Sequence, residues 1–215
     1  MSLSGMAYPA YEDLQAVLAA APPGESGTLR LWALTVLGET AARIGEPAAA
    51  EQHFKAALTL GIRDVYLLGA YADFLLNQDR PRDVRSLLEK EVRVDPLLLR
   101  LAVAEKALGT PELARHIADL SNRFAEARMR GDTSHRREEA WFTLDLLNQP
   151  DPALRLAEAN WEVQREPADL RLLIRAALIA DAPSAARSAL EWLAASHLQD
   201  TVIAPLARRL QEALK

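Results

Sequence analysis

Cysteine is absent from this chain of 215 residues, and glycine and histidine are scarce. The absence of cysteine excludes disulfide bonds, thiolate zinc sites and a cysteine nucleophile. With only 9 glycines, the chain contains neither a phosphate-binding glycine loop nor a G-x-G-x-x-G motif. The four histidines (His53, His116, His135 and His197) are far apart, and no H-E-x-x-H motif occurs. The sequence therefore predicts no cofactor and no metal site.

The chain also lacks an excess of positive charge and a long apolar run. The 25 Lys and Arg residues are outnumbered by 30 Asp and Glu, for a net charge of −5, which disfavours nucleic acid as a partner. Apolar stretches such as residues 97–103 are broken by charges, well short of the ~20 residues that membrane insertion needs. Residues 1–7 resemble a vector-derived or disordered start of a fragment. We expect a soluble protein, with cytoplasmic and periplasmic locations both open.

Good helix formers dominate what is present, with 40 Ala and 37 Leu residues. A proline followed by an Ala/Leu-rich amphipathic run recurs at intervals of 34, 30, 41 and 31 residues, and we expect each proline to open a helix. These prolines are Pro47, Pro81, Pro111, Pro152 and Pro183. We predict helices at 10–20, 28–44, 47–60, 65–77, 81–93, 96–108, 111–130, 135–148, 152–165, 168–180, 183–195 and 202–214.

Two further landmarks support this register. The tetrapeptide Leu-Leu-Asn-Gln occurs at 75–78 and again at 146–149, each time shortly before a helix-opening proline. Pro96 and Pro167 each lie fifteen residues beyond such a proline, and we expect them to close the second helix of their pairs. The 41-residue interval predicts a long helix from Pro111 towards Arg130, which should protrude or skew the stack.

A helix–turn–helix unit of 34 residues resembles the tetratricopeptide repeat. Three sets of residues match that family's positions: Leu34, Leu37 and Gly38 on one first helix, Ala50, Phe54 and Ala57 on the following second helix, and Leu68, Tyr71 and Ala72 on the next first helix. Later second helices depart from the pattern, with Val84, Leu88 and Glu91 and then Arg155, Ala159 and Glu162. The resemblance covers about residues 30–200. Segments 131–133 and 161–167 are similar to the C-terminal part of uncharacterised proteobacterial repeat proteins, which suggests a bacterial origin.

The resemblance implies an all-α fold, a right-handed α–α superhelix of about five helix pairs plus terminal helices. The array should span residues 8–200, with a C-terminal capping helix at 201–215. It also implies a non-enzymatic interaction module that holds a peptide or protein segment on its concave face. The groove candidates are Trp32, Thr35, Glu39, Arg43, Tyr66, Asp73, Asn77, Lys106, Asn148, Arg171 and Arg175.

Several alternatives stay open at this point. Trp32 and Tyr66 either face the groove or pack against residues 10–20. The family's carboxylate clamp is absent because its positions hold Thr35, Glu39, Gly69 and Asp73, and the two acids favour a ligand with some positive charge. Self-association into a homo-oligomer through the apolar face of Leu14, Val17 and Leu18 is the rival to a ligand groove.

Other patterns receive ordinary structural interpretations. We interpret the charged run 135–139 as a solvated helix start and Arg130-Gly131-Asp132 as a helix end rather than an adhesion motif. Four aromatic residues are expected in the core: Trp141, Phe142, Trp161 and Trp192. Nothing in the spacing of Glu89, Glu91, Glu139 and Asp145 distinguishes them from surface acids, so an enzyme is disfavoured.

Overall fold

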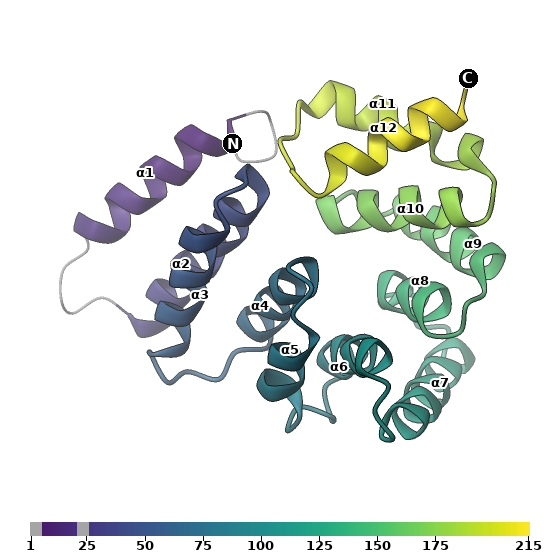
Figure 1. Cartoon of the computed structure of the whole chain (residues 1–215), viewed down its shortest axis with the longest axis horizontal. Coiled ribbons are helices and arrows are strands. Elements are labelled where there is room, and N and C mark those ends of the chain that lie inside the picture. The colour runs from purple at the N-terminus through teal and green to yellow at the C-terminus, as the bar shows by residue number, and fades with distance from the viewer. Residues whose placement is uncertain (1–5, 21–25) are drawn as a thin grey trace. The chain divides into compact units, whose positions relative to one another are not determined.

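The computed structural model describes residues 6–20 and 26–215, and these residues form helices and no strand (Figure 1). The predicted all-α fold is confirmed. The elements are α1 (Ala7–Ala20), α2 (Gly27–Ile44), α3 (Pro47–Leu58), α4 (Val65–Asn77), α5 (Pro81–Leu88), α6 (Asp95–Leu108), α7 (Leu113–Met129), α8 (Arg136–Asp145), α9 (Pro150–Trp161), α10 (Pro167–Ile179), the 3-10 helix η1 (Pro183–Ala186), α11 (Arg187–Ser196) and α12 (Ile203–Ala213). The expected start at residues 1–7 falls mostly outside the described residues.

The prolines mark helix starts less uniformly than the sequence suggested. Pro47 and Pro81 do begin α3 and α5, but Pro111 precedes α7 by two residues and Pro183 opens a 3-10 helix. Pro152 is the third residue of α9. The expectation that Pro96 and Pro167 close second helices is wrong, because both lie in the first turn of the next helix, α6 or α10. A proline near a helix start removes no intrahelical hydrogen bond.

The chain divides into two compact units. The N-terminal unit contains the residues up to Arg80 together with Leu193–Val202, and the C-terminal unit contains Pro81–Trp192 and Ile203–Lys215. In both units most helices pack on a neighbour in the chain, and first helices also pack on first helices: α2 on α4, α6 on α8, and α8 on α10. This contact between alternate helices is what stacked helical pairs require.

The N-terminal unit is built around Phe54 of α3. Its ring is fully buried and lies 5.2 Å from the Tyr71 ring and 5.6 Å from the Phe74 ring, both on α4. On its other side, Gly38 of α2 leaves room for the ring, because a Cβ atom there would lie 2.7–2.9 Å from three ring carbons. A glycine in mid-helix costs helix stability, and here it permits close packing of α2 against α3.

Residues 193–202 complete the N-terminal unit from the far end of the chain. The backbone N–H of Thr201 donates to the carbonyl oxygen of Arg43 over 3.0 Å, and its hydroxyl donates to the carbonyl oxygen of Ala42 over 3.3 Å. These carbonyls belong to the last turn of α2, where carbonyls lack their usual i+4 partners, and that of Ala42 also accepts from the backbone N–H of Gly45. A segment about 160 residues away in sequence therefore covers the end of α2.

In the C-terminal unit, the long helix that the 41-residue interval predicted is α7, which has 17 residues. It ends as predicted at Gly131, which has a φ of +70°, and the N–H of Asp132 donates back to the carbonyl oxygen of Ala127. The final helix α12 packs on α10 through Ile203, Ala207 and Leu210. Of the four aromatics expected in the core, Phe142 and Trp161 are buried, whereas Trp141 and Trp192 are only partly buried.

Candidate functional site

The N-terminal unit presents an exposed aromatic surface on its first helices. Trp32 on α2 is 51% exposed and Tyr66 on α4 is 50% exposed. The Tyr66 hydroxyl donates a hydrogen bond to the Glu39 carboxylate, and Glu39 lies two turns after Trp32, on the same side of α2. Leu29, one turn before Trp32, and Val65, next to Tyr66, are also exposed. We call these five residues the α2–α4 face.

The remaining groove candidates of this unit have varied positions. The prediction is wrong for Thr35, which is fully buried because its hydroxyl donates to the Leu31 carbonyl oxygen at 2.8 Å and so needs no contact with water. Arg43 and Asp73 are partly buried, and the Arg43 guanidinium donates to the hydroxyl of Thr40 at 3.2 Å. Asn77, the last residue of α4, is exposed.

In the C-terminal unit, the candidates gather around Asp145 at the end of α8. Arg175 of α10 donates to both carboxylate oxygens of Asp145, at 2.7 and 2.9 Å. The Lys106 ammonium of α6 donates to the backbone carbonyl of Asp145 and, at 2.8 Å, to the amide oxygen of Asn148. Arg171 lies one turn before Arg175 on α10. The structure therefore brings four predicted residues to one surface of α6, α8 and α10.

Sequence reasoning missed three members of this surface, Trp141, Asp145 and Arg100. The Trp141 indole N–H donates to Asp145 at 2.6 Å, and the guanidinium carbon of Arg100 lies 5.2 Å from the centre of the Trp141 ring. Trp141 was expected in the core and Asp145 was regarded as an undistinguished surface acid. Their i, i+4 spacing on a helix was the available signal, because it places both side chains on the same face.

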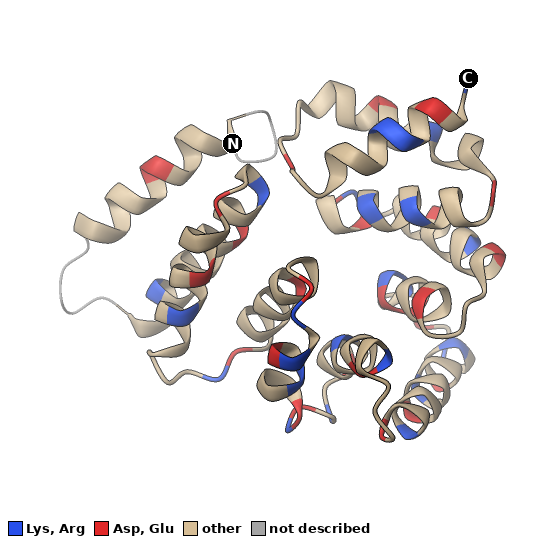
Figure 2. Cartoon of the chain, viewed as in Figure 1, with Lys and Arg blue, Asp and Glu red and all other residues tan. Residues whose placement is uncertain are grey.

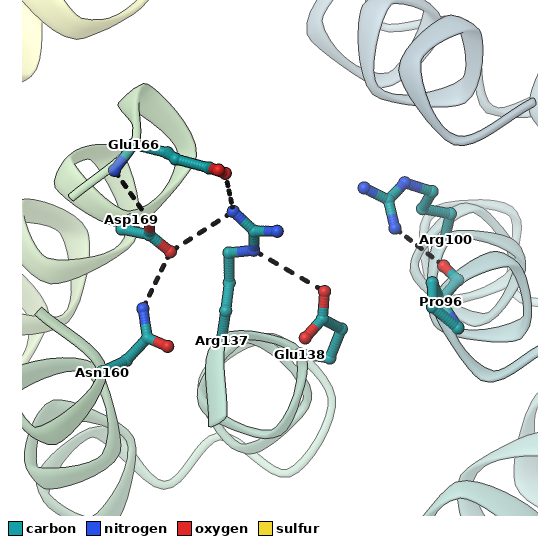
Figure 3. Close-up of polar contacts among 7 residues, drawn as sticks. All are labelled: Pro96, Arg100, Arg137, Glu138, Asn160, Glu166 and Asp169. Carbon is teal, nitrogen blue, oxygen red and sulfur yellow. Dashed lines mark hydrogen bonds and ion pairs between the residues drawn. The ribbon is translucent and has the colours of Figure 1, made fainter. Parts of the chain in front are cut away.

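A charge network fixes α8, α9 and α10 to one another beside this surface (Figure 3). The buried Asp169 carboxylate accepts from Asn160 at 2.8 Å, from the backbone N–H of Glu166 at 2.9 Å, and from Arg137 at 3.4 Å. Burial raises the pKa of Asp169 above its ordinary value. The nearby positive charge of Arg137 lowers this pKa, but by less than burial raises it. Burial also raises the pKa of Glu166, but the hydrogen bond and the charge of Arg137 outweigh burial and hold this pKa below its ordinary value.

The same network corrects the interpretation of residues 135–139 as a solvated helix start. Arg137 is tied to α10, and Glu139 is buried and paired with Arg128 of α7. Glu91, regarded as a surface acid, is buried as well. Between α7, α8 and α9 lies a small cleft of about 210 Å³, whose charged lining residues are this Arg128–Glu139 pair.

Among residues 6–20 and 26–215, no three His, Asp or Glu side chains are grouped so that they could hold a metal ion. Over the same residues, none of the helices combines the length and the apolar character that a membrane crossing requires. Comparison of the chain with protein-family models, curated proteins and solved structures gave no match. The function must therefore be inferred from the surfaces themselves.

Proposed function

We propose that this protein is a non-enzymatic interaction module that binds a peptide or protein segment on the first helices of its helical pairs. The observation that carries the proposal is the exposure of Trp32 and Tyr66 on adjacent first helices. Aromatic side chains are the commonest anchors of protein interfaces, because a large rigid ring buries much apolar area at little cost in entropy. The tetratricopeptide-like register of the sequence supports the same function.

The packing beneath the α2–α4 face favours binding without rearrangement. Phe54, Tyr71 and Phe74 hold α3 against α4, and the hydrogen bond from Tyr66 to Glu39 joins α4 to α2. A surface that is already ordered loses little conformational entropy when a ligand binds. The helices that carry Trp32 and Tyr66 are therefore held together, which favours a partner with apolar groups at a matching interval.

The test is a selection of short peptides from a random displayed library with the complete chain as bait. Covering the exposed half of Trp32 removes ~125 Å² from water, worth up to ~3 kcal/mol. The double variant W32A/Y66A should therefore weaken binding of the selected peptides at least about tenfold. M129A/V163A is the matched control, since these apolar residues are 81% and 74% exposed elsewhere on the surface. Equal affinities for wild type and W32A/Y66A, measured by calorimetry, would remove the basis of the proposal.

Self-association is the second candidate, and one observation on α1 favours it. Val17 is 67% exposed. Tyr8 in the same helix and Met6 just before the helix are exposed as well. Leu14 and Leu18, which were expected on the same free face, are partly covered, so the apolar surface is smaller than predicted. Light scattering over a wide concentration range decides this alternative: a constant monomeric mass excludes it.

A further inference from the structure

The cleft between α7, α8 and α9 is a concave site that the proposed function does not use. Its volume is about 210 Å³, whereas an engineered cavity of ~150 Å³ in another protein is enough to bind benzene. All three helices belong to the C-terminal unit. The cleft therefore has room for a molecule slightly larger than one benzene ring.

Half of the cleft lining is apolar and comes from all three helices and the segment before α9. These residues are Phe124, Phe142, Leu147, Pro152 and Leu156. The centres of the Phe124 ring on α7 and the Phe142 ring on α8 lie 5.3 Å apart, and both rings are almost fully buried. Pro152 and Leu156 are one turn apart on α9. A short aliphatic or aromatic group in the cleft would leave water for an apolar surface, which favours its binding.

The charged lining of the cleft consists of two residues of opposite sign. Figure 2 shows residues of both signs along α7 and α8, but only Arg128 and Glu139 of the described charged residues line the cleft. They form an ion pair with each other, so the cleft has no net charge. A ligand with a single charge would upset this balance, whereas a ligand with one cation and one anion would keep it.

Each member of this pair can still bind a second group. The Glu139 side chain is 12% exposed and accepts from Arg128 at Oε1, and within residues 6–20 and 26–215 no donor contacts its Oε2 atom. Arg128 is 58% exposed and donates through Nη1, so its other N–H groups have no side-chain or backbone acceptor within those ranges. The pair therefore offers a ligand one acceptor oxygen and several donors while staying intact.

We propose that the cleft binds an α-amino acid with an apolar side chain, whose ammonium contacts Glu139 and whose carboxylate contacts Arg128. An α-amino acid carries both charges on one carbon, as close together as the open groups of an ion pair, and charge-assisted hydrogen bonds are the strong ones. Its side chain would lie against Phe124, Phe142 and Leu156. This inference adds a ligand site to the proposed function and does not rest on it, since the α2–α4 face contributes no residue.

The test follows the backbone amide NMR signals of the complete chain during titration with L-leucine. Leucine should shift signals from α7, α8 and α9, with a Kd in the millimolar range that suits so small a ligand. Three analogues keep the aliphatic group and change the charges: 3-methylbutylamine lacks the carboxylate, 4-methylpentanoate lacks the ammonium, and 4-methylpentanamide has neither charge. Each should bind about tenfold more weakly than leucine, because it loses at least one charge-assisted hydrogen bond. Glycine should bind more weakly as well, because it lacks the apolar group.

One variant separates the two ends of the ligand. R128Q removes the partner of the carboxylate, so it should weaken leucine binding about tenfold and change 3-methylbutylamine binding by about twofold or less. The matched control is R130Q, which removes an arginine just after α7 that is 64% exposed, pairs with Glu126 and does not line the cleft. It should change leucine binding by about twofold or less.

Four results would each overturn the proposal. They are no leucine-dependent shifts in α7, α8 and α9, an analogue that binds as tightly as leucine, glycine that binds as tightly as leucine, and equal losses in R128Q and R130Q. The first three use the wild-type chain, so they do not depend on how a variant folds. The fate of the proposed function is separate: if W32A/Y66A abolishes peptide binding while leucine fails to bind the wild-type chain, only the amino-acid site is refuted.

Discussion

Gly38 offers a sharp test of how the N-terminal unit is packed. Replacing a mid-helix glycine with alanine normally stabilises a helix by about 1 kcal/mol. Here the new methyl group would lie 2.7–2.9 Å from three carbons of the Phe54 ring, whereas carbon atoms normally approach to ~3.5–4.0 Å. The ring is fully buried, with the Tyr71 ring stacked on it and the Phe74 ring tilted against it, so it has little room to retreat.

The two effects can be weighed against each other. Overpacking of a well-filled core costs ~1–3 kcal/mol, and the gain in helix propensity offsets about 1 kcal/mol of it. We therefore expect G38A to destabilise the N-terminal unit by up to about 2 kcal/mol. In an F54L background the ring is gone and only the propensity effect remains. The same substitution should then stabilise the unit by up to about 1 kcal/mol, a coupling of about 2 kcal/mol between the two positions.

The assay must report on one unit, because the chain folds as two. Native-state hydrogen exchange, read by mass spectrometry on peptides from α2, α3 and α4, gives the opening free energy of the N-terminal unit. Peptides from α8 and α9 in the same samples serve as the internal reference. If G38A has the same sign of effect with and without the Phe54 ring, the steric explanation is refuted.

Two further predictions concern charged groups. Arg80 and then Lys55 hold the pKa of Glu51 down to about 2 from its ordinary 4.5, so the ionised form stabilises the fold above pH 4.5 and this contribution is lost as the pH falls through about 2. E51Q should therefore be about 1 kcal/mol less stable than wild type at pH 6, and urea titrations should show the difference vanishing near pH 2; a difference independent of pH would contradict this. D169A should cost about 2–4 kcal/mol in urea unfolding, because Asn160 and the Glu166 N–H lose a buried acceptor. D169N, which keeps the volume and one acceptor oxygen, should cost less, and equal losses would show that the negative charge opposite Arg137, not the acceptor oxygen, matters.

The helices could be predicted because their signals are local. Apolar periodicity and proline placement located α4 to the residue and most other helices to within a few residues. α5 ends five residues earlier than expected, at Leu88, since the residues after it form turns. Counting residues along the helix placed Thr35 on the groove face, and this prediction was wrong. A threonine whose hydroxyl bonds to a carbonyl of its own helix can be buried like an apolar residue.

Long-range pairing was beyond such reasoning. The surface around Asp145 depends on which side chains α6 and α10 bring to α8, and a carboxylate in the sequence does not reveal its partner. The division at Arg80 was equally hidden, since no linker composition marks it. The return of Thr201 to α2 is made mainly by a backbone N–H, which any residue except proline carries.

That return has a consequence for how the chain is made. Residues 81–192 are synthesised between the two parts of the N-terminal unit, and at ~5–20 residues per second this takes roughly 6–22 s. Throughout that interval the end of α2 lacks the donors that Thr201 later supplies, and the site that buries Leu198 is unfilled. The helices of the N-terminal unit thus leave the ribosome well before they gain their complete set of contacts, and a translational pause before residue 193 would prolong their exposure to proteases and chaperones.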